Sequence, residues 1–429
     1  MIFDIIVLTL VLLFLIASIT FIVRQLILRR RAKLCFSTID TVHVNKWEES
    51  FLDKKRMMSD DLADKAVEAI MARNDLNRVN DLFNVFTKGG QKLGDDAPPE
   101  LKQYFEETGK MPEWVDRRLI DLGQQIYIRH GVWISLMLSY KSLPECYACA
   151  NGAQVLYRTG RLNEKMGSTS VFSRRIAETA QFIMFVMTPG GLDADNRGIV
   201  AIQKLRLIHG VIRYYLRKSN WGTEKYGEPI NQEDLAGTLM AFSALVNEGL
   251  EKMDIKLEPI ELEAYIYCWR VIGILLGIDA DLIPANAADA LKLGYRIMDH
   301  QKAKSEQGSI LMKALLEYQD ALPNPIIGEQ NNISMFRFMM GDEMSELLDV
   351  PQDDKPTTDK MINRLKRITG VMEFLDKSMI LAMILQLLNK IGIRYVIRRM
   401  TKSDIVHFFL PTGLKTDREN ISPNENPIA

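Results

Sequence analysis

Apolar residues recur at helical spacing through most of this 429-residue chain, and this periodicity constrains the fold more than any other feature. Helix starts are indicated by Asn231, which precedes a polar first turn, and by Pro259. No alternation of apolar and polar residues is long enough to predict a β-strand. The sequence therefore predicts an all-α fold with a globin-like, multi-helix domain packed around a shared centre. The predicted helices are residues 62–86, 112–129, 173–187, 197–217, 232–252, 259–276, 285–302 and 308–319.

An uncharged apolar run fills residues 5–23, which is long enough to cross a hydrocarbon core of about 30 Å as a helix. Asp4 precedes the run, whereas basic residues follow it from Arg24 to Lys33. A cleaved signal peptide would carry its basic residues before a shorter apolar core. The positive-inside rule then predicts a single transmembrane helix in the lipid bilayer, with the N-terminus outside and the remaining chain in the cytoplasm.

Composition divides the chain into four parts: an anchor with its basic flank (1–33), a helical domain (45–350), a C-terminal helical extension (355–412) and a polar tail (413–429). The tail is polar enough to be disordered. In the extension, the apolar stretch 379–388 is too short to span a membrane and is followed by basic residues. A helix on a membrane surface and a buried helix with a basic end are equally compatible with it.

The formal net charge is −1, from 54 Lys and Arg against 55 Asp and Glu. Nucleic-acid binding needs a clustered basic surplus, so the composition argues against a nucleic-acid partner. The phosphate-binding loop, the dinucleotide-binding glycine pattern and the H-E-x-x-H zinc motif are absent from the sequence. The five histidines are scattered, so a metal in this chain is best explained by one histidine that holds a haem.

Cys146 and Cys149 form a C-x-x-C pair among four cysteines. A zinc site would need a second pair, and a c-type haem site would need His where Ala150 stands. We therefore interpret both cysteines as small residues that pack between helices.

His209 lies in a predicted helix with Arg206 three residues before it and Arg213 four after it, so the three share a helix face. This face suits a haem, because imidazole binds iron and guanidinium groups pair with propionate carboxylates. The neighbouring Gly210 would let a flat ring approach. Two other interpretations stay open: a histidine hydrogen-bonded in the core, and arginines paired with acids of the next helix.

The chain resembles the catalytic domain of the latex-clearing proteins (rubber oxygenases) and of the endoplasmic-reticulum-bound oxygenase of mycophenolic acid biosynthesis. The resemblance covers roughly residues 110–350. Its marks are R-x-x-x-T at Arg175 and Thr179, R-x-x-H-x-x-x-R around His209, segments 229–250 and 265–278, and Arg337-x-x-x-Gly341-Asp342. Each motif is loose alone, but their order and spacing are specific together.

The resemblance implies a haem b cofactor and O₂ as co-substrate. It implies that His209 is the proximal iron ligand and that Arg175 and Thr179 lie near the distal pocket. Arg206, Arg213 and Arg337 would support the haem or the structure around it. Rubber oxygenases cleave isoprenoid C=C bonds, so an apolar, unsaturated substrate is expected here.

The sequence departs from the family in one place. Rubber oxygenases carry Lys directly before the pocket Thr, whereas this chain has Glu178. A carboxylate there could act as the catalytic base, and Glu164 is another acidic residue nearby. The expected cytoplasmic location disfavours a polymer and favours a smaller lipid-like molecule.

These observations predict a membrane-anchored, haem-dependent oxygenase with a catalytic set of Arg175, Glu178 and Thr179. One alternative is a haem-binding sensor or carrier without turnover. The other is a non-enzymatic helical adaptor at the membrane, in which His209 is a core residue. The oligomeric state is not fixed by the sequence.

Overall fold

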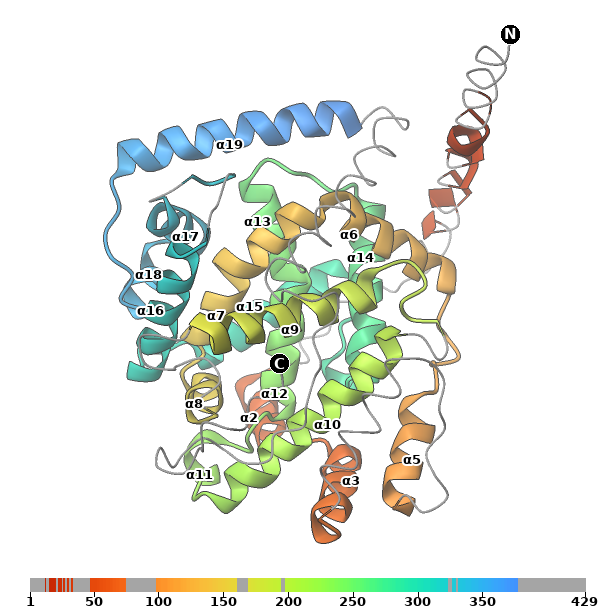
Figure 1. Ribbon diagram of the computed structural model, residues 1–429, viewed down its shortest axis with the longest axis vertical. Helices are drawn as coiled ribbons and strands as arrows, with labels where there is room; N and C mark the ends of the chain where they lie inside the picture. The colour runs from red at the N-terminus through yellow and green to blue at the C-terminus, as the bar shows by residue number, and fades with distance from the viewer. Residues whose placement is uncertain are drawn as a thin grey trace.

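The computed structural model describes residues 47–74, 98–159, 169–193, 197–322, 326–328 and 331–376, with residues 12, 15–20, 22–24, 26, 27, 29, 30, 32 and 33. The described residues form helices packed around one centre and contain no β-strand (Figure 1). Their one isolated β-bridge joins Cys149 to Lys302. The all-α part of the predicted fold class is therefore confirmed.

Within the residues that the structure describes, the helices fall into two consecutive groups along the chain. The first group is α2 (Glu49–Arg56), α3 (Asp61–Ala72), α5 (Pro99–Thr108), α6 (Arg117–Met137), α7 (Leu143–Ala148), α8 (Ala150–Arg158), α9 (Thr169–Met187) and α10 (Arg197–Lys218). The second group is α11 (Thr223–Tyr226), α12 (Gln232–Phe242), α13 (Ala244–Lys252), α14 (Pro259–Leu275), α15 (Ala287–Gln301), α16 (Glu306–Asp320), α17 (Asn332–Met340), α18 (Asp342–Leu347) and α19 (Lys355–Asp376). A π-helical turn (Leu138–Ser142) joins α6 to α7, and a 3₁₀ turn (Ala280–Leu282) precedes α15.

Most predicted helices are present, but three differ clearly from their predicted bounds. The helix predicted over 112–129 begins and ends later, as α6 (Arg117–Met137). The segment 232–252 is interrupted at Ser243, whose backbone has φ −120° and ψ −88°. Its hydroxyl donates to the Leu239 carbonyl at 2.7 Å, a local bond that competes with the regular helix ladder. The helix predicted over 62–86 ends at Ala72 in α3, and residues 75–86 lie outside the described residues.

Side-chain caps explain why several helices begin where they do. Asn231 Oδ1 accepts from the Asp234 N–H at 2.9 Å, and Asn286 Oδ1 accepts from the Asp289 N–H at 2.8 Å. Ser305 caps α16 in the same way. Each cap pairs an N–H that the first helical turn leaves without an intrahelical partner.

The central packing depends on close helix contacts. At Gly123 of α6, a Cβ atom would lie 2.2 Å from the Ala264 carbonyl oxygen of α14, so only glycine permits this approach. Gly210 of α10 packs in the same manner against α3, where a Cβ would lie 3.0 Å from Val67 Cγ2. The glycine beside His209 therefore serves helix packing and does not face a ligand.

The predicted membrane-spanning helix over 5–23 is wrong. Among the residues that the structure describes, no helix combines the length and apolar character needed to cross a bilayer. Residues 5–11, 13, 14 and 21 of the predicted span lie outside the described residues. The predicted single-pass topology, with the N-terminus outside and a cytoplasmic catalytic domain, is overturned with it.

Two of the basic residues after this run have partners in the helical domain. Arg24 pairs with Asp121 of α6 at 3.0 Å. Arg29 pairs with Glu258 at 3.1 Å and with Glu261 of α14 at 2.8 Å. Ion pairing with the domain therefore accounts for two of the charges that the sequence pattern assigns to a cytoplasmic flank.

The C-terminal extension begins with α19, which crosses one end of the molecule over α17 (Figure 1). Thr369 donates to the Met253 carbonyl at 2.8 Å, and Lys366 pairs with Asp254 at 3.1 Å. These contacts fix α19 to the loop after α13. The apolar stretch 379–388 and the tail 413–429 lie outside the described residues.

Candidate functional site

A cavity of about 260 Å³ lies between α9, α10, α12 and α15. An engineered protein cavity of about 150 Å³ holds benzene, so this one has room for a longer apolar molecule. Most of its wall is apolar, which favours ligands of low polarity. The apolar lining includes Val155, Leu156, Phe182, Leu205, Ile212, Ile230, Leu235, Leu239, Phe242, Leu276, Ile278 and Ile297.

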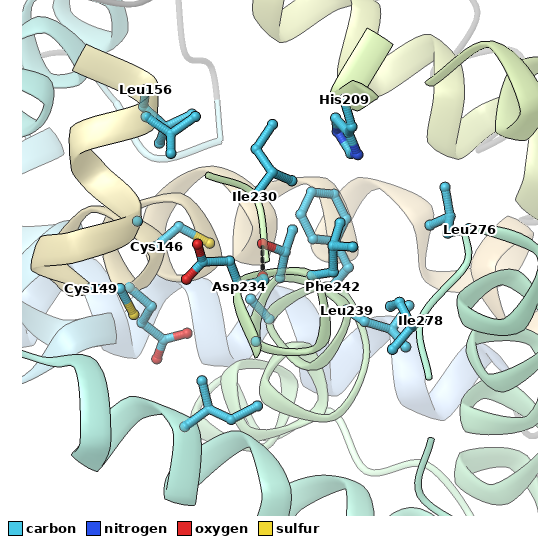
Figure 2. Close-up of a pocket in the computed structure, with 18 of the residues that line it drawn as sticks. Cys146, Cys149, Leu156, His209, Ile230, Asp234, Leu239, Phe242, Leu276 and Ile278 are labelled. Carbon is cyan, nitrogen blue, oxygen red and sulfur yellow. Dashed lines mark hydrogen bonds between the residues drawn. The ribbon is translucent and has the colours of Figure 1, made fainter. Parts of the chain in front are cut away.

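His209 is half-buried and lines this cavity from the middle of α10. Figure 2 shows its ring directed into the space from one side, towards Phe242. Arg175 and Thr179, one turn apart on α9, line the same cavity. The Thr179 hydroxyl donates to the Arg175 carbonyl at 3.1 Å. The structure thus brings together three of the predicted site residues from two helices.

Arg206 and Arg213 point to α3 and do not line the cavity. Arg206 Nη2 lies 2.8 Å from Asp60 Oδ1, and Nη1 donates to the Leu275 carbonyl at 3.2 Å. Arg213 is fully buried, and its Nε lies 2.6 Å from Asp64 Oδ1. These arginines fix α10 against α3, as in the ion-pair interpretation left open by the sequence.

Glu178 is buried at 2% exposure and also lies off the cavity wall. Its Oε2 accepts from Arg175 Nη1 at 3.1 Å, and its Oε1 lies 3.4 Å from Arg174 Nε. Burial lowers the pKa of the neighbouring Lys204 to about 8, and the charge of Glu178 opposes that shift. Glu178 therefore occupies a charge cluster between α9 and α10. Glu164, the other acid considered, lies outside the described residues.

Arg337, on α17, also lies outside the cavity wall. Its Nη2 lies 2.6 Å from Asp342 Oδ1, Nη1 donates to the Val350 carbonyl at 3.2 Å, and Nε lies 3.3 Å from Asp353. Gly341, between α17 and α18, has φ +82°, a conformation that favours glycine. The R-x-x-x-G-D motif thus forms a helix junction and lies outside the cavity wall.

Sequence reasoning missed a second polar part of the cavity wall. Glu145 and Cys146 of α7, Cys149, Asp234 of α12 and Gln301 of α15 all line the cavity. Figure 2 shows Cys146, Cys149 and Asp234 away from His209. The C-x-x-C pair therefore faces a cavity, where helix packing alone had been predicted. Only that pair gave a signal in the sequence, because no fixed spacing connects α7, α12 and α15.

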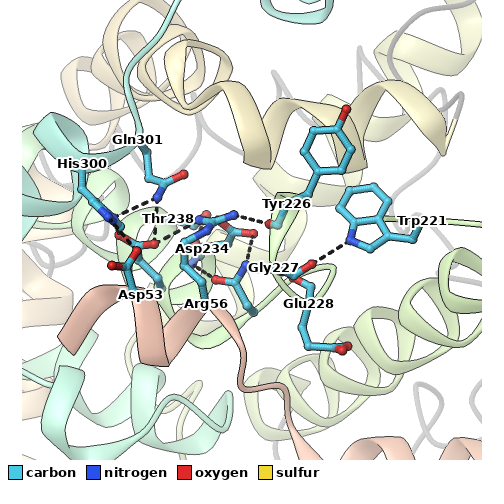
Figure 3. Close-up of polar contacts among 12 residues, drawn as sticks. Asp53, Arg56, Trp221, Tyr226, Gly227, Glu228, Asp234, Thr238, His300 and Gln301 are labelled. Atoms are coloured by element: carbon cyan, nitrogen blue, oxygen red, sulfur yellow. Dashed lines mark hydrogen bonds and ion pairs between the residues drawn. The ribbon is translucent and has the colours of Figure 1, made fainter. Parts of the chain in front are cut away.

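Behind this wall lies a buried ionic network (Figure 3). Arg56 Nη1 lies 3.0 Å from Glu233 Oε2 and 3.1 Å from Asp234 Oδ1. His300 Nδ1 lies 2.6 Å from Glu233 Oε1, and His300 Nε2 lies 3.3 Å from the exposed Asp53. Burial raises the pKa of Glu233 and of Asp234, while the charge of Arg56 opposes both shifts.

Burial also raises the pKa of the two thiols in this wall. The pKa of Cys146 rises to about 12, and that of Cys149 rises well above its usual value. Because the thiolate is the reactive form, both side chains are neutral and weakly nucleophilic near pH 7. This part of the wall therefore offers hydrogen-bonding groups and no activated nucleophile.

Comparison with known proteins agrees with this architecture. Residues 148–374 match the family described as ER-bound oxygenase mpaB/B'/Rubber oxygenase, catalytic domain. The rubber oxygenase of Streptomyces sp. (strain K30) is 26% identical over 314 residues, which cover 71% of this chain and 73% of that protein. The structure of latex clearing protein LCP in the closed state aligns with a TM-score of 0.62 at 20% identity, over 87% of this chain and 94% of that one.

Proposed function

The chain belongs to the ER-bound oxygenase mpaB/B'/rubber oxygenase family, and we propose that it is a haem b-dependent oxygenase of an apolar, unsaturated substrate. Family membership identifies the chain as an oxygenase, and thus as an oxidoreductase. The haem, its ligand and the substrate are our proposal. It is carried by one observation: the imidazole of His209 faces an apolar cavity beside Arg175 and Thr179.

The residues around the cavity fit a haem group. Imidazole nitrogen is a common ligand of haem iron, and the apolar wall would keep water away from a bound haem. Arg175 is the only Lys or Arg among the described lining residues, and its guanidinium can pair with a propionate carboxylate. Arg206 and Arg213 would contribute indirectly, because their ion pairs with α3 orient the helix that carries His209.

The haem and the residues around the cavity would each have a distinct role. A bound haem would supply an iron centre that activates O₂. His209 would hold the iron from α10. Arg175 can donate hydrogen bonds at the cavity wall, and Thr179 Oγ1 can accept one there while it donates to the Arg175 carbonyl. Phe182, Leu239 and the other apolar lining residues would hold an alkene-bearing chain and exclude water.

A polymeric substrate was disfavoured only by the expected cytoplasmic location of the catalytic domain. Because the single-pass topology behind that expectation is wrong, a polymeric substrate is compatible with the proposal. A relative is named a rubber oxygenase. We therefore propose an alkene-bearing apolar chain and place no upper limit on its length.

An absorption spectrum of the purified full-length protein with added haem b tests the assignment. We expect a Soret band that shifts on reduction with dithionite, disappears in His209→Ala and persists in the control His130→Gln. A His209→Ala protein that kept the band would refute the ligand assignment. A wild-type protein that binds haem but consumes no O₂ with unsaturated lipids would be a haem sensor or carrier.

A further inference from the structure

One end of the cavity carries polar side chains, among them two carboxyl groups and an amide, that the proposed haem chemistry does not use. We call it the acceptor end; it comprises Glu145, Cys146, Cys149, Asp234 and Gln301. Figure 2 shows Cys146, Cys149 and Asp234 together on one side of the cavity. The bridge between Cys149 and Lys302 brings the end of α15, with Gln301, to the same place.

Gln301 supplies the first indication of a ligand. Its side-chain amide donates from Nε2 to Glu233 Oε2 at 2.9 Å, and this bond fixes which end of the amide is the oxygen. The residue is only 5% exposed, and its Oε1 is buried without a hydrogen-bond partner. An unpaired buried acceptor is unfavourable, so a donor from a ligand would remove that cost.

Glu145 supplies a second, independent indication from another helix. It is 6% exposed, and its Oε1 accepts from the buried Lys141 ammonium. Its Oε2 is buried and has no hydrogen-bond partner. Two unpaired acceptors, one from α7 and one from α15, therefore line the same cavity end.

The charges at this end determine whether a negative, neutral or positive polar group of a ligand is favoured. Arg56 is shared by the carboxylates of Glu233 and Asp234, and Glu233 also contacts His300 Nδ1 at 2.6 Å. Among the described residues of the acceptor end there is no Lys or Arg. A carboxylate or phosphate group would meet acceptors and negative charge, whereas a neutral or cationic donor would be stabilised.

We infer that the cavity binds an apolar chain that ends in a hydrogen-bond donor. An alcohol would donate its single O–H to Gln301, whereas a protonated amine has enough N–H groups to bind both Gln301 and Glu145. The apolar wall takes the chain, and the acceptor end determines its orientation. Describing this molecule as the substrate rests on the proposed function, but the binding preference does not.

Four probes with the same chain test the inference: 1-octanol, octylamine, methyl octyl ether and octanoate. Binding to the full-length protein is measured by calorimetry, with and without added haem b. We expect the alcohol and the amine to bind about tenfold more tightly than the ether, the effect of one well-formed buried hydrogen bond. Octanoate should bind more weakly than the alcohol in the haem-loaded protein, where the proposed haem occupies Arg175. Equal affinities for the alcohol and the ether would overturn the inference.

Variants locate the preference. Gln301→Met keeps the length of the side chain but removes the free oxygen, and it should reduce the alcohol's affinity about fivefold to tenfold without changing that of the ether. Glu145→Gln should weaken octylamine more than octanol. Asp299→Asn, which alters a 66% exposed side chain of the same helix, is the matched control and should change neither. If Gln301→Met binds the alcohol as tightly as wild type, Gln301 is not the acceptor.

The haem assignment and the acceptor-end inference can be refuted independently of each other. A protein that binds haem through His209 but does not distinguish the probes would refute only the acceptor end. A protein that prefers the alcohol but never binds haem would refute only the haem assignment. The ligand series in the wild-type protein needs no folded variant to give this answer.

Discussion

Arg206 of α10 binds both carboxylate oxygens of Asp60, the residue that precedes α3: Nη2 contacts Oδ1 at 2.8 Å, and Nε contacts Oδ2. Both side chains are nearly buried, at 11% and 4% exposure. Such bidentate pairs fix geometry as well as charge. Because His209 lies one turn after Arg206, the pair sets the orientation of the helix wall that carries the candidate iron ligand.

Asp60→Asn should destabilise the fold by about 3 kcal/mol, because it leaves a buried guanidinium without its counter-charge. The side chain also caps α3 through the Ala63 N–H, a bond that Asn can retain. Urea unfolding monitored by circular dichroism measures the change. The control Glu106→Gln removes an exposed pair with Lys110, in which both side chains are more than half exposed, and should cost under about 1 kcal/mol. Equal losses in the two variants would contradict this role of the Arg206 pair.

Gly277→Ala should lower the free energy of unfolding by about 2–3 kcal/mol, which is more than left-handed backbone strain alone would cause. Gly277 has φ +82°, and an added Cβ would lie 2.5 Å from Arg206 Cζ, whose position Asp60 fixes. Gly222→Ala is the matched control, since it has φ +83° and only ordinary contacts with Tyr226 from 3.7 Å, so it should cost about 1 kcal/mol. Thermal unfolding compares the two. If Gly222→Ala proved the more costly, the close contact with Arg206 would not be the cause.

Glu178→Gln distinguishes two roles for this residue: the catalytic base that the sequence predicts, and the ion-pair partner that the structure shows. Since Glu178 pairs with Arg174 and Arg175 and does not line the cavity, we expect a loss of about 2–3 kcal/mol in stability. The haem spectrum at saturating haem should stay unchanged, and the pH dependence of O₂ uptake should keep its shape. If the variant kept its stability but lost or shifted one side of the pH profile of O₂ uptake, Glu178 would instead be a catalytic base.

His130→Gln should make the protein less sensitive to acid. The pKa of His130 is lowered from 6.5 to about 3, mainly by burial and then by the charge of Arg129, while Glu261 opposes the shift. Between these two values the unfolded chain binds a proton that the folded chain does not, so the stability present above pH 6.5 is lost as the pH falls towards 3. Gln cannot titrate, so the fall in Tm from pH 7.5 to pH 4.5 should be smaller in the variant. Parallel curves for the two proteins would show that another group causes the acid loss.

Local sequence signals predicted the helices well where periodicity and caps agreed. Asn231 and Pro259 mark the starts of α12 and α14 as expected. The break at Ser243 was missed, because the apolar spacing continues across it and only the backbone shows the interruption. The apolar run at the N-terminus was misinterpreted, because the partners of Arg24 and Arg29 lie in distant parts of the chain.

The sequence by itself determined the helical class and the family motifs, and the family resemblance grouped His209 with Arg175 and Thr179 as one candidate site. The helical class and the shared face of Arg175 and Thr179 follow from spacing along single helices, which the 3.6-residue repeat converts directly into shared faces. Only the tertiary structure decided which arginines face the cavity, since Arg206 and Arg213 turn to the acids of α3 and Arg337 to those near α18. It also assembled the acceptor end from α7, α12 and α15, because burial and counter-charge depend on residues that lie far apart in the sequence.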